Sequence, residues 1–109
     1  MVHKKKFNKY YLYYVTNHAT VPAQLLLYNN TSFCGWIYFY HEHLSLPTPY
    51  WSDGGFIIYF KLNEFDRIMN ILSREKPLMV LYNDVALYAG FGTVEKEPIG
   101  EMEPPIRLF

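Results

Sequence analysis

The residues with the clearest potential for chemistry are His41 and His43, one residue apart at the end of an aromatic run. On a β-strand this spacing projects both imidazoles from the same face, which is one way to begin a metal site. A stable zinc site needs at least three protein ligands, however. The other histidines, His3 and His18, fall in a predicted tail and a predicted turn. We therefore expect no tight metal site and no cofactor.

Gly35, His41 and His43 resemble the opening of the cupin metal motif. A cupin carries a glutamate four or five residues beyond its second histidine, where this chain has Pro47 and Thr48, and the later histidine motif is missing. A symmetric dimer that pools both histidine pairs across its axis is the one remaining route to a metal site.

The single cysteine, Cys34, excludes an intramolecular disulfide and is typical of a reducing compartment. Strict strand alternation places Cys34 on the face of Trp36 and opposite His41, so the sequence predicts an inert, buried thiol. No serine motif, phosphate loop or carboxylate pair completes a catalytic set, and we predict no catalytic residue. Without a signal peptide or a long apolar run, the expected location is cytoplasmic.

Composition points to surface use of aromatic side chains. The chain has 109 residues, a formal net charge of zero and 19% aromatic residues, among them eleven tyrosines. Zero net charge makes nucleic-acid binding an unfavourable hypothesis, and the lysines near the amino end are predicted to form a solvated tail. Eleven tyrosine hydroxyls are more than one small core can satisfy, so several tyrosines should lie on a binding surface or a subunit interface.

Hydrophobic periodicity predicts the elements that position these residues. Strands are expected at 7–17, 21–30, 33–41, 55–62, 77–82 and 85–92, with one helix near 64–75. The fold class is therefore α+β, mainly β: a bent antiparallel sheet or small barrel of about six strands, in the order β-β-β-β-α-β-β, with one helix. We expect a single domain over residues 1–94 and a Pro- and Glu-rich arm or tail over 95–109.

The predicted helix should start at an Asn63 cap. Its apolar stripe consists of Phe65, Ile68, Met69 and Leu72. The last strands should form a hairpin with a short turn at Asn83-Asp84.

Alternation also divides two central strands into faces. The core set is Ile37, Phe39, Phe56, Ile58 and Phe60. The opposite, semi-polar set is Trp36, Tyr38, Tyr40, Ile57, Tyr59 and Lys61, joined by Tyr82 or Tyr88. The second set is expected at a subunit interface or in a ligand cleft.

Residues 41–55 form a predicted loop stiffened by Pro47 and Pro49, with Tyr50 and Trp51 at its tip. Two large aromatic side chains on a rigid loop can stack on a planar ligand or anchor a partner. Alternatively, they fold back and cap the barrel. Both interpretations fit the sequence.

The stretch from Phe65 through "ILSREKPLMVLY", followed by "EKEPIGEMEP", resembles small uncharacterised bacterial single-domain proteins with an "EKP" after a helix and a late "EPxGE". The resemblance covers about half of the chain and implies no activity.

The leading hypothesis is a non-enzymatic, homo-oligomeric binding protein that uses a Tyr/Trp-rich surface. Its preferred ligand is a planar small molecule such as a nucleotide, because aromatic rings stack on bases; sequestration of a nucleotide in a phage or mobile element is one setting for it. The first alternative is a protein-interaction module that docks a partner through the tyrosine face, and the second is a small metalloenzyme using His41 and His43. The expected ligand-binding residues are Tyr50, Trp51, Trp36, Tyr38, Tyr40, Tyr59, His41, His43, Lys61, Arg67 and Arg74.

Overall fold

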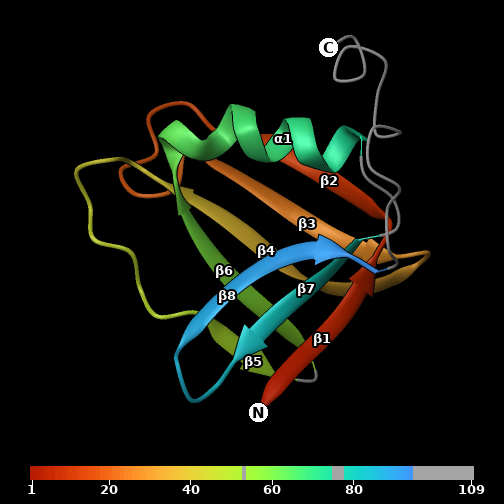
Figure 1. Ribbon diagram of the computed structural model, residues 1–109. Helices are drawn as coiled ribbons and strands as arrows, with labels where there is room; N and C mark the ends of the chain where they lie inside the picture. The colour runs from red at the N-terminus through yellow and green to blue at the C-terminus, as the bar shows by residue number, and fades with distance from the viewer. Residues whose placement is uncertain (53, 75–77, 95–109) are drawn as a thin grey trace, which may run out of the picture.

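The chain folds into strands and one short helical segment. The computed structural model describes residues 1–52, 54–74 and 78–94 (Figure 1). The strands are β1 (Val2–Phe7), β2 (Lys9–Tyr14), β3 (Ala23–Asn29), β4 (Ser32–Tyr40), β5 (Tyr50–Ser52), β6 (Gly55–Lys61), β7 (Leu78–Asn83) and β8 (Tyr88–Thr93). A 3-10 turn, η1 (Leu62–Glu64), leads directly into helix α1 (Phe65–Arg74). The predicted mainly-β α+β class with one helix is confirmed, whereas the predicted 95–109 arm lies outside the described residues.

The strands form two open sheets instead of the predicted single bent sheet or small barrel. The larger sheet has the order β2-β3-β4-β6-β5, and the smaller has the order β1-β7-β8. All pairings are antiparallel except that of β4 with β6, which is parallel. The expected all-antiparallel sheet of about six strands is therefore wrong. The long connection after β4 lets the chain return through β5, so that β6 enters beside β4 in the same direction.

The two sheets are joined where β1 runs into β2 at Asn8. The Asn8 amide side chain donates to the Asn30 Oδ1 at 3.0 Å, and the Asn30 backbone N–H donates to the Asn8 Oδ1 at 2.8 Å. The Asn8 N–H donates to the Tyr28 carbonyl at 2.9 Å. These bonds fix the point at which the chain leaves the small sheet and enters the large one.

The predicted basic tail is wrong, because residues 2–7 are strand β1, paired with β7. Burial alternates along β1: His3, Lys5 and Phe7 are the less exposed residues, and Lys4 and Lys6 point to solvent. A lysine can lie on the inner side of a strand when its stem packs on apolar atoms. Here the Lys5 ammonium lies 5.6 Å from the ring centroid of Trp51.

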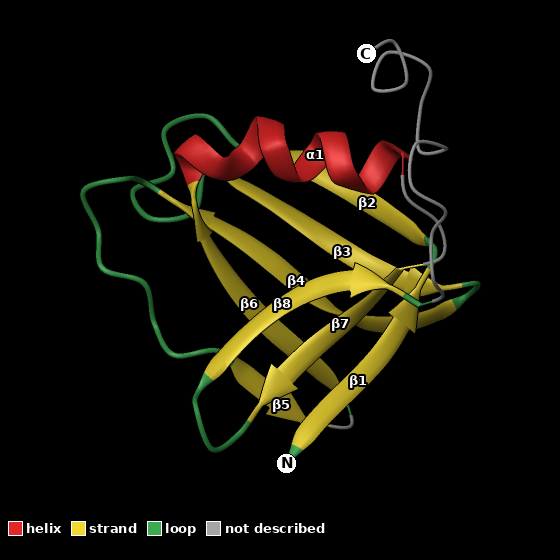
Figure 2. Ribbon diagram, in the orientation of Figure 1, coloured by secondary structure: helices red, strands yellow, loops and turns green. Residues whose placement is uncertain are grey.

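One hydrophobic core is shared by both sheets and α1. The predicted core side chains of β4 and β6 are confirmed by their burial: Ile37, Phe39 and Phe56 are fully enclosed and Ile58 nearly so, while Phe60 packs against this core from its edge. Figure 2 shows α1 along the β2 and β3 side of one face of the large sheet, with the small sheet in front of β5 and β6. The other face of the large sheet is covered by no element in the described ranges.

The helix presents its predicted stripe to this core. Ile68 and Leu72 are buried, and Phe65 and Met69 pack beside them. The predicted Asn63 cap is not formed, because η1 starts two residues earlier, at Leu62, after Lys61 and without a side-chain cap.

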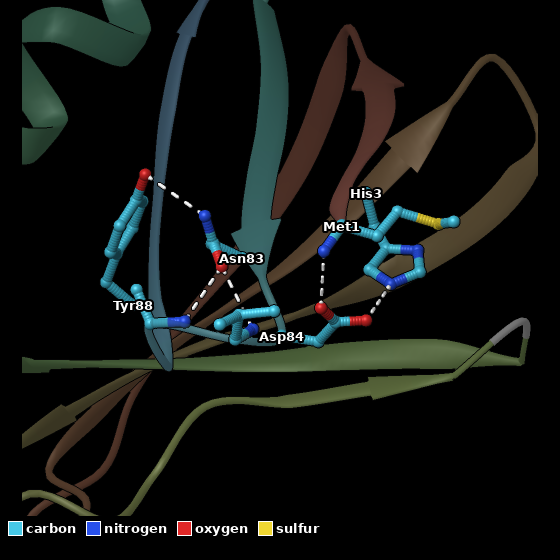
Figure 3. Close-up of polar contacts among 7 residues, drawn as sticks. Met1, His3, Asn83, Asp84 and Tyr88 are labelled. Atoms are coloured by element: carbon cyan, nitrogen blue, oxygen red, sulfur yellow. Dashed lines mark hydrogen bonds and ion pairs between the residues drawn. The ribbon is translucent and has the colours of Figure 1, made fainter.

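The β7–β8 turn is longer than predicted and is organised by Asn83, the last residue of β7. Its Oδ1 accepts the N–H groups of Val85 at 2.9 Å and Ala86 at 2.8 Å (Figure 3). This asparagine turn spaces the strands by residues 84–87. Over the described residues, no helix is long and apolar enough to span a membrane.

Candidate binding surface

The uncovered face of the large sheet carries aromatic side chains on neighbouring strands. Along β4 the residues Trp36, Tyr38 and Tyr40 are half-buried and alternate with the enclosed core residues. Strand register places Tyr38 beside Tyr59 and Tyr40 beside Lys61. The predicted division of these strands into an apolar and a semi-polar face is therefore confirmed.

Ring contacts continue this face across four strands. Tyr11 of β2 meets Tyr28 of β3 at 5.5 Å between centroids, and Tyr28 meets Phe33 at 5.5 Å. Phe33 meets Trp36 at 4.7 Å, and Trp36 lies 6.4 Å from Tyr38.

Two contacts complete the row on β6. Tyr59 lies 5.9 Å from Tyr38 and 5.4 Å from Tyr40. We name this set the aromatic belt: Tyr11, Tyr28, Phe33, Trp36, Tyr38, Tyr40 and Tyr59. Most of its neighbouring rings meet edge to face, the arrangement that aromatic quadrupoles favour. The belt is a preformed surface, since each ring is held by its neighbours.

Two of the belt hydroxyls, those of Tyr38 and Tyr59, stay protonated over a wide pH range. Desolvation raises the pKa of Tyr38, with a further contribution from the nearby Tyr40. Desolvation also raises the pKa of Tyr59, again reinforced by Tyr40 and Tyr38. Both hydroxyls are therefore neutral hydrogen-bond donors at any physiological pH.

The belt carries little charge. Lys61 is at its edge, but the ammonium donates to the carbonyl of Glu42 at 2.8 Å and to that of Leu44. This lysine thus pins the loop after β4. Lys9 pairs with Tyr28 at the start of β2. Recognition on this face must rest mainly on apolar contact and on tyrosine hydroxyls.

A hollow of about 700 Å³ lies at one end of the belt, where β2 begins. Tyr11 and Tyr28 line it from the belt, and Phe7, Leu72 and Leu78 line it from the core side. Among its lining residues the only charged side chain is that of Lys9. A hollow of this kind can receive an apolar side chain of a partner.

His41 and His43 lie at the far end of β4, with ring centroids 5.8 Å apart. The His41 Nε2 donates to the His18 carbonyl at 2.9 Å, and the His18 Nδ1 accepts the N–H groups of Thr20 and Val21. The pair is therefore brought together, but one of its ring nitrogens is engaged by the backbone. In the part of the chain that the structure describes, no group of three or more His, Cys, Asp or Glu residues could hold a metal ion.

Trp51 was predicted at a loop tip, but it lies in the short edge strand β5. Its ring stacks on Phe56 at 5.4 Å, on Tyr82 at 5.8 Å and on His3 at 5.6 Å. We name His3, Trp51, Phe56 and Tyr82 the ring stack. Because His3 and Tyr82 belong to the small sheet, the ring stack closes the space between the two sheets.

A polar cluster lies beside the ring stack (Figure 3). The Asp84 carboxylate accepts from the Met1 amino group at 2.7 Å and from the His3 Nε2 at 3.0 Å. The hydrogen bond from the amino group, followed by that from His3, lowers the pKa of Asp84. These contacts hold the start of β1 against the end of β7.

The remaining predicted binding residues are dispersed. Tyr50 is 55% exposed on β5 and pairs with Ile57. Arg67 and Arg74 are on α1, which packs on the opposite face of the sheet from the belt (Figure 1). The Arg67 guanidinium reaches Glu64 at 3.4 Å. The structure therefore unites Trp36, Tyr38, Tyr40 and Tyr59 but separates the arginines from them.

Sequence reasoning missed Tyr11, Tyr28 and Phe33 as members of the belt. Tyr11 and Tyr28 sit on alternate positions of predicted strands, so the signal was present, but their place depends on which strands are neighbours. Phe33 reaches the belt through a bulge, because the β3–β4 register shifts between Leu27 and Tyr28.

The same bulge corrects the position of Cys34, which lies in the core and not on the Trp36 face. Its predicted burial is confirmed at 4% exposure, and the thiol donates to the Lys6 carbonyl at 3.4 Å. Desolvation raises the pKa of this thiol, so little thiolate forms at neutral pH.

No protein-family model, curated protein or solved structure matches the chain. The resemblance to small bacterial proteins stays a prediction, and its "EKP" and "EPxGE" segments lie outside the described residues.

Proposed function

We propose that the protein is a non-catalytic binding module that docks a protein partner through the aromatic belt. The observation that supports it best is an unbroken row of seven aromatic rings, each next to another ring of the row. This row lies on a sheet face that no described element covers. Tyrosine and tryptophan are enriched where protein interfaces carry most of their binding energy.

The ring geometry favours a protein partner over a nucleotide. Interplanar angles of 90° for Tyr11 and Tyr28, and of 70° for Tyr38 and Tyr59, set ring edges against ring faces. Such rings offer a corrugated surface with hydroxyls, whereas a base stacks on an open ring face. The cations expected for phosphate are also remote, since α1 carries Arg67 and Arg74 behind the sheet.

The low charge of the belt defines the chemistry of the partner. Lys61 is held by backbone carbonyls, so a phosphorylated or acidic peptide would find few cations. The neutral hydroxyls of Tyr38 and Tyr59 favour a surface with apolar side chains and hydrogen-bond acceptors. An apolar residue of the partner would occupy the hollow beside Tyr11 and Tyr28.

Site-specific photocrosslinking in the cell of origin tests the proposal. A benzophenone amino acid at Tyr38 should give discrete adducts with a protein, whereas the same group at Ile71, exposed on α1 behind the sheet, should give none. The purified partner should then bind the wild-type protein, and Trp36→Ala should weaken binding by about tenfold or more, as loss of an interface anchor does.

A second measurement separates the alternatives. A thermal-shift panel of nucleotides and divalent metals should leave the melting temperature unchanged, because only a ligand that binds the folded state raises it. Adducts at Tyr38 no stronger than at Ile71, or a shift with a nucleotide that Trp36→Ala removes, would refute protein docking. A shift with zinc that is lost in His41→Ala would instead support the metal hypothesis.

A further inference from the structure

Strand β2 is a free edge of the large sheet. In the described part of the chain it pairs only with β3, and all six of its residues are exposed. The Val15 N–H donates to the Pro22 carbonyl at 2.7 Å, and antiparallel hydrogen-bonded pairs recur every second residue. Tyr11 and Tyr13 therefore direct their backbone groups to β3. The N–H and C=O groups of Tyr10, Leu12 and Tyr14 point outward.

This edge lacks the features that keep other edges from pairing. Proteins protect exposed edges with lysines, prolines, bulges or very short strands. The β1 edge carries Lys4, Lys5 and Lys6, and β5 has only three residues. The β2 edge has one lysine, Lys9 at its first position, a regular register with β3 and no proline.

The sequence of β2 is self-complementary. Residues 10–14 read Tyr-Tyr-Leu-Tyr-Tyr, a palindrome about Leu12. We infer that a second copy of this chain pairs its β2 antiparallel to the first, with the two-fold axis between the two Leu12 residues. Tyr10 then lies opposite Tyr14 of the second copy, and Tyr11 opposite Tyr13 of the second copy.

The backbone pattern selects this register. At a two-fold axis, the central residue must lie opposite the same residue of the second copy. The residues whose backbone groups point outward are Tyr10, Leu12 and Tyr14. Centring on Leu12 makes every outward residue part of a pair that exchanges two backbone hydrogen bonds. Centring on Tyr11 or Tyr13 would pair only two of these three residues with each other and would leave the third opposite a residue outside β2.

The helix leaves room for the second strand. Tyr10 and Leu12 point to the same side of the sheet as α1, yet they are 38% and 42% exposed. An open groove separates Tyr10 from Arg67, Met69 and Asn70 of the helix. Tyr14 of the second copy, opposite Tyr10, would lie at this groove.

Pairing would join the two large sheets into one and place the two aromatic belts on the same side. Tyr11 of one copy and Tyr13 of the other would continue the row of rings across the axis. The inference does not depend on the proposed partner of the belt. The β2 edge offers six residues a side, fewer than the roughly 20 of a standard interface, so we expect a dimer that forms in the micromolar range.

Sedimentation of the purified chain tests the dimer in the absence of any partner. We expect reversible dimerisation, abolished in Leu12→Pro. Proline removes an N–H that faces away from β3, so the variant should keep its circular dichroism and its unfolding transition. Tyr13→Pro is the matched control, because it removes an N–H bonded to β3 and should lose the fold.

Cysteine crosslinking tests the register, in a Cys34→Ser background. Cα atoms of a hydrogen-bonded pair lie about 5.5 Å apart, within disulfide range, so Leu12→Cys should form a crosslinked dimer on oxidation. Tyr14→Cys is more exposed but should not crosslink, because its counterpart is four residues away along the strands. A wild-type monomer at hundreds of micromolar, a dimer that persists in Leu12→Pro, or equal crosslinking at both positions would overturn the inference.

Discussion

Gly35 determines how closely β4 and β6 can pair. A Cβ atom at this position would lie 2.5 Å from the Phe56 carbonyl oxygen and 2.6 Å from the Phe56 nitrogen. Both are backbone atoms of a buried strand, so the strands would have to separate. The parallel pairing of β4 with β6, which sets the register of the belt, therefore leaves no room for a side chain at position 35.

We predict that Gly35→Ala destabilises the fold by about 1–3 kcal/mol, the usual cost of forcing extra atoms into a packed core. Denaturant unfolding measures this change. Gly90→Ala is the matched control, since a Cβ there would meet no described atom within 4 Å. Equal stability of the two variants would show that β4 and β6 are not packed as closely as described.

Two belt tyrosines, Tyr38 and Tyr59, predict how the stability of the fold changes at alkaline pH. The pKa values of Tyr38 and Tyr59 in the folded protein are raised above the ordinary value of 10.0. Above that pH the unfolded chain loses these protons first, so stability is full below pH 10 and falls as pH rises through the raised pKa values. Tyr59→Phe should lessen this fall.

Urea unfolding between neutral pH and pH 11 measures the effect, and absorbance at 295 nm follows ionisation. An identical slope in wild type and Tyr59→Phe would show that the Tyr59 hydroxyl is not desolvated in the folded protein.

At the scale of elements, period-two alternation in the sequence predicted which side of each strand is buried. It identified Ile37, Phe39 and Phe56 as core and Trp36 with Tyr38 as the opposite face, because each strand must bury one side. The helical stripe ending at Leu72 was predictable for the same reason. These assignments depend only on residues within one element.

What alternation could not predict depends on neighbouring strands. Lys4, Lys5 and Lys6 resemble a solvated tail, but the Lys5 ammonium lies over the ring of Trp51, a contact with a residue distant in sequence. The bulge beside Tyr28 moved Phe33 into the belt and Cys34 into the core. Parallel pairing of β4 with β6 is nonlocal, so neither the two open sheets nor the whole belt could be predicted from the sequence.

At the scale of the whole molecule, the two sheets act as one body through a few side chains. Phe7 and Val80 of the small sheet are buried in the same core as Phe39 of the large sheet. At the opposite end, the ring stack joins Trp51 to His3 and Tyr82. The small sheet and α1 thereby cover one face of the large sheet, and the belt lies on the other face (Figure 2).

We therefore predict that Trp51→Ala destabilises the whole protein by about 2–3 kcal/mol, somewhat less than truncation of a fully buried tryptophan. Unfolding should remain a single transition, because both sheets share one core. Tyr50→Ala, its exposed neighbour on β5, should cost less than about 1 kcal/mol, as surface substitutions do.

Denaturant unfolding followed by circular dichroism and by the fluorescence of Trp36 tests this pair of variants. Coincident transitions in Trp51→Ala would show that the sheets still unfold together. If Trp51→Ala instead separates the two signals, the small sheet is held mainly by the ring stack and the shared core contributes little. If Tyr50→Ala is as costly as Trp51→Ala, β5 as a strand stabilises this edge, and the stacking of Trp51 on His3 and Tyr82 is not the cause.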